Sequence, residues 1–136
     1  LDVSDSRGGS HNLVIGDQHK YPSYGGIVTG WRNEILNVYS AVVGGYFNAA
    51  TGAWSTVTGG SENKASGGCA SSISGGFDNT ASGDFSSVLG GKSNDAFGVE
   101  AVVTGGVNNK AIGRFTSVVG GRKNRAWKKY SVVTGA

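Results

Sequence analysis

Apolar and polar residues return along this chain at a fixed interval. From Gly30 onward a glycine recurs every fifteen residues, with one step of sixteen between Gly60 and Gly76. From Gly45 onward it is the second glycine of a pair. A β-branched apolar residue stands three positions before it in every unit: Ile27, Val42, Val57, Ile73, Val88, Val103, Val118 and Val133. Such an internal period is typical of a solenoid, in which each repeat packs only against its neighbours.

The length of the repeat predicts strands and turns. Fifteen residues are too few for a helical hairpin but suit two short strands and two tight turns. The β-branched column favours a strand and is expected to point inward as the solenoid core. An opposing column is almost entirely alanine, which predicts a narrow interior: Ile35, Ala50, Ala65, Ala81, Ala96, Ala111 and Ala126. The predicted fold class is all-β, a single-domain parallel β-solenoid (β-roll) of about eight coils of 14–16 residues.

An asparagine stands three positions after the glycine in every unit: Asn33, Asn48, Asn63, Asn79, Asn94, Asn109 and Asn124. Asparagine tolerates the left-handed backbone conformation, and stacked amides can hydrogen-bond from one coil to the next. We therefore expect a structural asparagine ladder, with the glycines supplying positive φ angles in the turns.

Two regions are expected within this one domain. Residues 1–29 are interpreted as an N-terminal loop and an irregular capping coil, because His19 to Tyr24 contain the only proline and two tyrosines. A cap of this kind covers the apolar interior and the unpaired backbone at the end of a stack. Residues 30–136 form the regular β-solenoid of fifteen-residue repeats.

The two outward faces are predicted to differ. The column six positions before the glycine, or seven in the sixteen-residue unit, is largely aromatic, and strand alternation places it on the outer face of the valine strand: Tyr39, Trp54, Cys69, Phe85, Glu100, Phe115 and Tyr130. Other positions on this face are small or β-branched, whereas the second strand exposes charges such as Glu34, Lys64 and Asp95. So long an exposed aromatic row indicates an oligomer interface, formed by Tyr39, Trp54, Phe85, Phe115, Tyr130, Val43, Leu89 and Val119. A ligand-binding aromatic strip and a plain ladder of cross-strand pairs remain alternatives.

Charge adds one candidate site. The net charge of +3 is mild, but six of the twelve basic residues gather in the last coils. Trp127 and Tyr130 lie between them. One interpretation is a surface for anionic glycans or phosphates; the other is a solvated terminal coil, or one that docks an acidic neighbour. The residues are Arg114, Arg122, Lys123, Arg125, Lys128 and Lys129.

The sequence offers little for catalysis or metal binding. Its histidines, His11 and His19, lie in the irregular part without a recurring nucleophile or carboxylate pair, and are interpreted as surface or cap residues. The single cysteine allows no internal disulfide, and no apolar stretch is long enough for a membrane helix. Asp78 and Asp95 occupy different columns, so the calcium-binding pattern of glycine-rich nonapeptides is not met. We predict no enzyme activity, no cofactor and no nucleic-acid partner.

One family resemblance rests on units such as Ser-Ser-Val-Leu-Gly-Gly-Lys-Ser-Asn-Asp-Ala-Phe-Gly, residues 86–98. This unit resembles the head repeats of trimeric autotransporter adhesins, and the resemblance covers about residues 12 to 136. The family's unit is nearer fourteen residues and has serine where this chain has asparagine. The resemblance implies a left-handed parallel β-roll, three of which associate side by side in an extracellular adhesive rod.

Three functions are compared. The leading hypothesis is a non-catalytic adhesive or fibre module, a homotrimeric rod on the cell surface or outside the cell that binds host or environmental surfaces. The second is a structural subunit whose coils stack end to end in an extracellular filament. A phage or injection-system tail-fibre segment, or an ice- or carbohydrate-binding solenoid, is the third. Because the chain begins without methionine and ends within a repeat, we expect a processed chain or a piece of a longer one.

Overall fold

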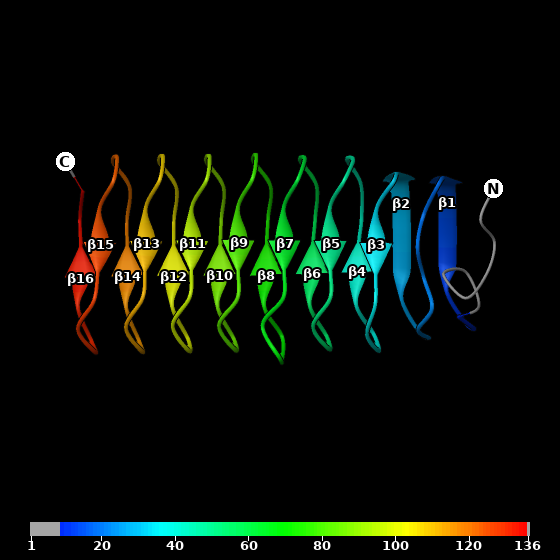
Figure 1. The fold of residues 1–136 in the computed structure, drawn as a ribbon, viewed down its shortest axis with the longest axis horizontal. Helices are drawn as coiled ribbons and strands as arrows, with labels where there is room; N and C mark the ends of the chain where they lie inside the picture. The colour runs from blue at the N-terminus through cyan, green and yellow to red at the C-terminus, as the bar shows by residue number, and fades with distance from the viewer. Residues whose placement is uncertain (1–8, 136) are drawn as a thin grey trace.

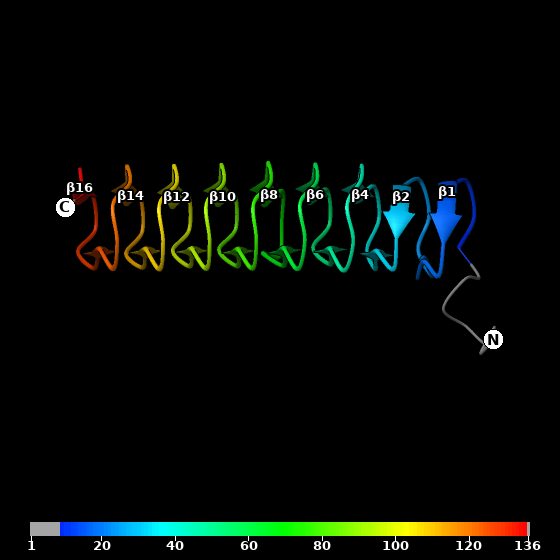
Figure 2. The same ribbon diagram turned by 90° about the horizontal axis from the view of Figure 1, so that it is seen from above.

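A computed structural model describes residues 9–135; residues 1–8 of the predicted N-terminal loop and Ala136 lie outside this range. All regular elements within it are β-strands. The coils stack along one axis into a straight rod, with the first and last coils at opposite ends (Figure 1). Viewed from above, each coil passes once through each of two sheets (Figure 2). This confirms the predicted all-β parallel β-solenoid of about eight coils.

The nine-stranded sheet, which we call sheet A, holds the valine column. All its strand pairs are parallel and in register, as Val88 against Val103 illustrates. Its strands are β1 (Leu13–Asp17), β2 (Ile27–Trp31), β4 (Ala41–Val42), β6 (Thr56–Val57), β8 (Ser72–Ile73), β10 (Ser87–Val88), β12 (Val102–Val103), β14 (Ser117–Val118) and β16 (Val132–Val133).

The seven-stranded sheet, sheet B, holds the alanine column and is also parallel, as Ala96 against Ala111 shows. β1 and β2 have five residues each, and every later strand has two, because the turns interrupt the ladder in each coil. The strands of sheet B are β3 (Glu34–Ile35), β5 (Ala49–Ala50), β7 (Lys64–Ala65), β9 (Thr80–Ala81), β11 (Asp95–Ala96), β13 (Lys110–Ala111) and β15 (Arg125–Ala126).

The core is a single layer between the sheets. From Val42 to Val118 every member of the predicted valine column is buried, and Val133 is partly buried. Ile35 and the alanines of sheet B are buried opposite them. The small alanine side chains let the sheets approach closely, so each coil buries only two main apolar side chains.

The predicted core residue Ile27 is wrong by one position. Ile27 is 39% exposed and Val28 is fully buried in its place. Val28 pairs with Val42, which is only fourteen residues further on, so this coil is one residue shorter between its valine and its glycine. Counting back from Gly30 by the interval of later coils therefore selects the outward neighbour.

The asparagine column forms a ladder of buried amides. The Nδ2 of Asn79 donates to the carbonyl of Gly75 at 3.1 Å and to that of Gly91, in the next coil, at 2.9 Å. Its Oδ1 accepts from the backbone N–H of Asn94 at 3.0 Å. Each amide thus bonds to backbone groups of its own coil and of the next coil, rather than to the next amide.

The left-handed backbone falls on the residue before each asparagine, not on the asparagine as expected. Phe47 has a φ of 54° and Glu62 a φ of 57°. Asparagine does not need this conformation itself, because its role is to fill the turn with its side chain. A column of buried hydroxyls on the other side of the coil was not predicted; Ser55, for example, donates to the carbonyl of Gly52 at 2.6 Å.

His19 takes the place of asparagine in the first coil. It is 4% exposed, its Nδ1 accepts from the N–H of Asn33 at 3.2 Å, and its Nε2 donates to the carbonyl of Ile15 at 3.1 Å. Of the two interpretations, surface or cap residue, His19 fits the second, because it starts the ladder inside the predicted capping coil. His11 is exposed.

We expect His19→Asn to leave stability nearly unchanged, because asparagine fills this position in every later coil. His19→Ala should lower the free energy of unfolding by about 1–3 kcal/mol, since it leaves the buried N–H of Asn33 without its acceptor. Urea denaturation measures both, with His11→Ala as the exposed control. Equal stability of His19→Ala and His11→Ala would contradict the ladder role of His19.

Val88→Asp should lower the free energy of unfolding by about 4 kcal/mol or more, because a carboxylate without a partner would enter a one-layer core. Phe97→Asp is the matched control, since Phe97 is 60% exposed on sheet B. Thermal and urea denaturation compare the two, and similar losses would show that the interior tolerates charge.

Candidate functional site

Beyond Asp17, the exposed last residue of β1, the outer face of sheet A carries no charge. Each coil contributes two outward positions, and all are small, β-branched or leucine; Leu89 is 49% and Val119 47% exposed. In the first rungs these are Leu13, Ile15, Ile27 and Thr29. The later rungs add Ala41, Val43, Thr56, Thr58, Ser72, Ser74, Ser87, Leu89, Val102, Thr104, Ser117, Val119, Val132 and Thr134. The predicted apolar positions Val43, Leu89 and Val119 all belong to this face.

A column of glycines borders this face without a reason inside the chain. The second glycine of each pair has a positive φ, such as 81° at Gly60. The first has neither a positive φ nor a close neighbour: a Cβ at Gly59, Gly75, Gly90, Gly105 or Gly120 would meet nothing within 4 Å, and one at Gly44 only Thr58 at 3.8 Å. Glycine where nothing in the chain requires it indicates close approach by another molecule.

The aromatic column was predicted to lie on the outer face of the strands, and this prediction is wrong. The column lies in the turn that leads from sheet B to sheet A. We call this the aromatic turn. Trp54 and Phe85, both 55% exposed, take φ angles of 54° and 57° there. In the sixteen-residue coil this place belongs to Ala70 and not to Cys69, because Gly68 is the extra residue. Tyr39, Phe115 and Tyr130 occupy the same turn, so the column borders sheet A instead of covering it.

A second aromatic cluster, not predicted, lies in the turn from sheet A to sheet B, the glycine turn. The ring of Trp31 lies edge-on to that of Phe47 at 5.7 Å, and Tyr46 lies edge-on to Phe47 at the same distance. Arg32 stands 4.6 Å from the Trp31 centroid. The sequence signal was weak, since these aromatics occupy two different columns of only two coils.

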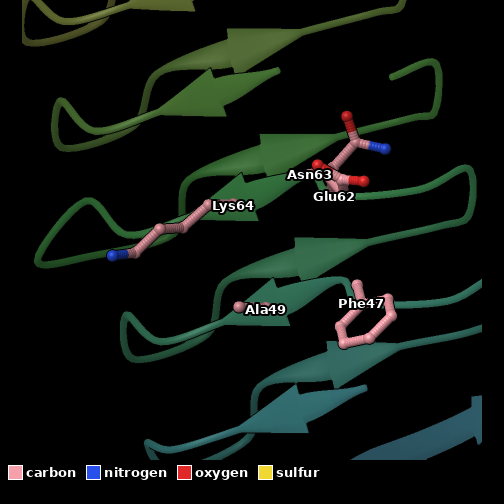
Figure 3. A pocket seen from close by; sticks show the side chains of 5 residues that line it. All are labelled: Phe47, Ala49, Glu62, Asn63 and Lys64. Atoms are coloured by element: carbon pink, nitrogen blue, oxygen red, sulfur yellow. The ribbon is translucent and has the colours of Figure 1, made fainter. Parts of the chain in front are cut away.

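Sheet B faces outward with charged side chains, as predicted, and with two hollows. The first, of about 430 Å³, is lined by Phe47, Ala49, Glu62, Asn63 and Lys64 (Figure 3). The second, of about 260 Å³, is lined by Asp95, Phe97, Lys110 and Ile112. Both open where a small or flat side chain separates longer neighbours on adjacent rungs.

The six basic residues of the last coils do not form one patch. Arg114, Lys128 and Lys129 lie in the aromatic turn, Arg122 and Lys123 in the glycine turn, and Arg125 on sheet B. All six are exposed. Cation–π contacts hold some of them: Arg114 lies 4.7 Å from the Phe115 centroid and Lys129 lies 4.7 Å from that of Tyr130. These two rings stack at 5.3 Å.

This positive charge is uncompensated within the last coils. Residues 101–136 hold seven basic residues and no acidic one, whereas residues 1–100 hold five basic and nine acidic residues. Residues 9–61 are balanced, with two basic and two acidic residues, and residues 62–100 hold five acidic and two basic residues. The rod is therefore negative in its middle coils and positive toward its C-terminal end. Such a field steers anions toward the last coils.

Over residues 9–135 no three His, Cys, Asp or Glu side chains gather where they could hold a metal ion. The same residues contain no helix long and apolar enough to cross a membrane. The chain matches no protein-family model and no curated protein.

Asp95 is the described carboxyl whose environment clearly changes its acidity. Burial raises its pKa, while the nearby charge of Lys110 and a hydrogen bond with Ser82 lower it, and burial dominates. Its Oδ1 is buried without a hydrogen-bond partner among the described residues. The folded state therefore holds this proton more tightly than the unfolded chain, and this carboxyl favours folding less as pH rises through that range.

Asp95→Asn should raise the melting temperature at about pH 7, because the neutral amide avoids burying a charge. The gain should disappear at about pH 3, where the aspartic acid is protonated in both states. Lys110→Gln should enlarge the pH dependence, since it removes the charge that favours the carboxylate. Melting curves across this pH range measure all three proteins, and a pH-independent gain would contradict the assignment.

Proposed function

We propose that this chain is a non-catalytic adhesive or fibre module displayed at the cell surface or outside the cell. Three left-handed β-rolls would associate side by side through sheet A, and the assembled rod would bind host or environmental surfaces. The resemblance to the head repeats of trimeric autotransporter adhesins is consistent with this arrangement. The absence of charge on sheet A from β2 to β16, together with the glycine column beside it, is the observation that carries the proposal.

Burial of sheet A gives both features a cause. An uncharged face of small and β-branched side chains loses little on leaving water and gains from apolar contact. Glycines along its margin let the backbone of a neighbouring copy approach closely. The exposed rings of Tyr39, Trp54, Phe85 and Tyr130 and the half-buried ring of Phe115 lie in the adjoining turn, where they would form the rim of the same interface. Aromatic residues are enriched at such interfaces.

A second binding role is supported by the charge of the last coils. Because the basic residues surround the coil on both turns and on sheet B, a flexible anionic chain would neutralise them better than a flat protein surface. We therefore propose anionic glycans as additional partners of Arg114, Arg122, Lys123, Arg125, Lys128 and Lys129. A trimer would present each weak site three times, and avidity would strengthen binding.

The decisive test is molar mass by light scattering after size-exclusion chromatography, over a range of concentrations. We expect a constant mass of three 13.8 kDa chains. Leu89→Lys combined with Val119→Lys should give monomers with an unchanged β-sheet circular dichroism spectrum, because six ammonium groups would meet in the interface.

The matched control is Phe97→Lys with Ile112→Lys, which places the same charges on sheet B and should leave the trimer intact. If the sheet A variant stays trimeric, the interface lies elsewhere. A mass that grows with concentration would favour the end-to-end filament instead.

A further inference from the structure

The two hollows on sheet B share one chemistry. Each combines an aromatic ring, an aliphatic side chain, a carboxylate and an ammonium group: Phe47, Ala49, Glu62 and Lys64 in the first, and Phe97, Ile112, Asp95 and Lys110 in the second. We infer that sheet B binds a neutral polysaccharide, with a sugar ring in each hollow. This inference rests on the proposed adhesive role and names its ligand class.

The aromatic wall of the first hollow is held in place before any ligand arrives. Phe47 packs edge-to-face with Trp31 at an interplanar angle of 77° and with Tyr46 at 70°. Arg32 lies 5.5 Å from the Phe47 centroid. Even so, Phe47 remains 46% exposed. A fixed exposed ring binds at a lower entropic cost than a mobile one, because its conformation is already chosen.

The charges at the rim indicate a ligand without net charge. Glu62 and Lys64 point away from each other (Figure 3), and neither belongs to the one ion pair of residues 9–135, which joins Lys20 to Glu34. A carboxylate only accepts hydrogen bonds and an ammonium only donates them. A charged ligand of either sign would meet a like charge at one side of the hollow, whereas hydroxyl groups satisfy both sides.

A pyranose ring meets all of these demands. Its C–H face is apolar and can lie on Phe47 or Phe97, while its hydroxyl edge both donates and accepts hydrogen bonds. Nucleic-acid phosphates would be repelled by Glu62 and Asp95. Hollows of several hundred Å³ with mainly apolar walls and a few polar groups are typical of small-molecule sites.

The positions of the hollows favour a polymer over a single sugar. The first lies between β5 and β7 and the second between β11 and β13, on the same outward face. Three rungs separate them, which at the usual strand spacing is about 14 Å. The first hollow is lined by residues on either side of the asparagine and the second by residues one and three positions after it, so the two are also offset across the sheet. A chain laid obliquely over sheet B would reach both, and joining two weak sites raises overall affinity. Sheet B also faces away from sheet A, so trimer formation would leave it open.

The test is affinity electrophoresis of the full chain in native gels that contain hydroxyethyl cellulose, xylan or mannan, with dextran sulfate as the anionic comparison. Phe47→Ser and Phe97→Ser remove the rings safely, because Ser93 and Ser82 occupy the equivalent positions in other coils. Phe77→Ser is the control for loss of an exposed ring, since Ser61 occupies its equivalent position and Phe77 lines neither hollow.

We expect retardation by at least one neutral polysaccharide, about three- to tenfold weaker in each single variant and lost in the double variant. Phe77→Ser should bind as the parent does. Three results would overturn the inference: no retardation by any neutral polymer, retardation that survives in the double variant, or retardation by dextran sulfate alone.

This experiment is separable from the test of the adhesive module. A chain that is monomeric by light scattering but retarded by a neutral polysaccharide would overturn the trimer and keep the sugar site. A double variant that remains trimeric and still attaches to surfaces as the parent does would keep the adhesive function and overturn the sugar site.

Discussion

The buried amide of asparagine is the interaction on which this rod depends. A solenoid coil of fifteen residues buries very little apolar surface, and its turns leave backbone groups that no strand partner can reach. The buried amide of Asn79 donates to a carbonyl of its own coil and to one of the next coil, and it accepts a hydrogen bond from the backbone N–H of Asn94 in that next coil. Because an unsatisfied buried polar group costs free energy, the ladder makes each coil depend on the next. This is how so narrow a core can hold a defined register.

The ladder also explains where sequence variation is tolerated. Inside the coil, asparagine, valine, alanine and a small hydroxyl residue return with few exceptions, and His19 shows that a second hydrogen-bonding side chain can start the column. Outside it, the residue before the asparagine ranges from Phe47 to Glu62 to Lys123, although all three have a positive φ. The fold therefore fixes the backbone at this position and leaves its chemistry open. Surface function on such a scaffold is set by side chains that the fold does not need.

The sequence was sufficient for the fold class and the interior because both depend on the period alone. Val88, Ala96 and Asn94 recur at one interval, and a strand-turn repeat can bury them in only one way. Errors arose in the coils of unusual length: the short coil moved the core from Ile27 to Val28. In the sixteen-residue coil the turn position is Ala70, six residues before Gly76, and not Cys69, which lies seven residues before it. The aromatic column was misplaced for another reason. Strand alternation was extended into residues that belong to a turn with a positive φ. The side chains of Trp54 and Phe85 do not favour a positive φ, so the sequence does not predict this turn.

The hollows of sheet B could not be predicted, because each is made by a contrast between neighbouring rungs. The small side chain of Ala49 is ordinary for its column. It lines a hollow only because the larger side chains of Phe47, Glu62 and Lys64 line the same space. Sheet A offers the opposite case, since its significance lies in uniformity. From β2 to β16 no outward position is charged, and glycine stands beside the sheet in unit after unit although the chain leaves room for a side chain. A surface kept uniform over the length of a rod suits contact with an equally regular partner, and another copy of the same chain is the simplest such partner. Local contrast on one sheet and uniformity on the other thus divide the rod into a face for ligands and a face for assembly.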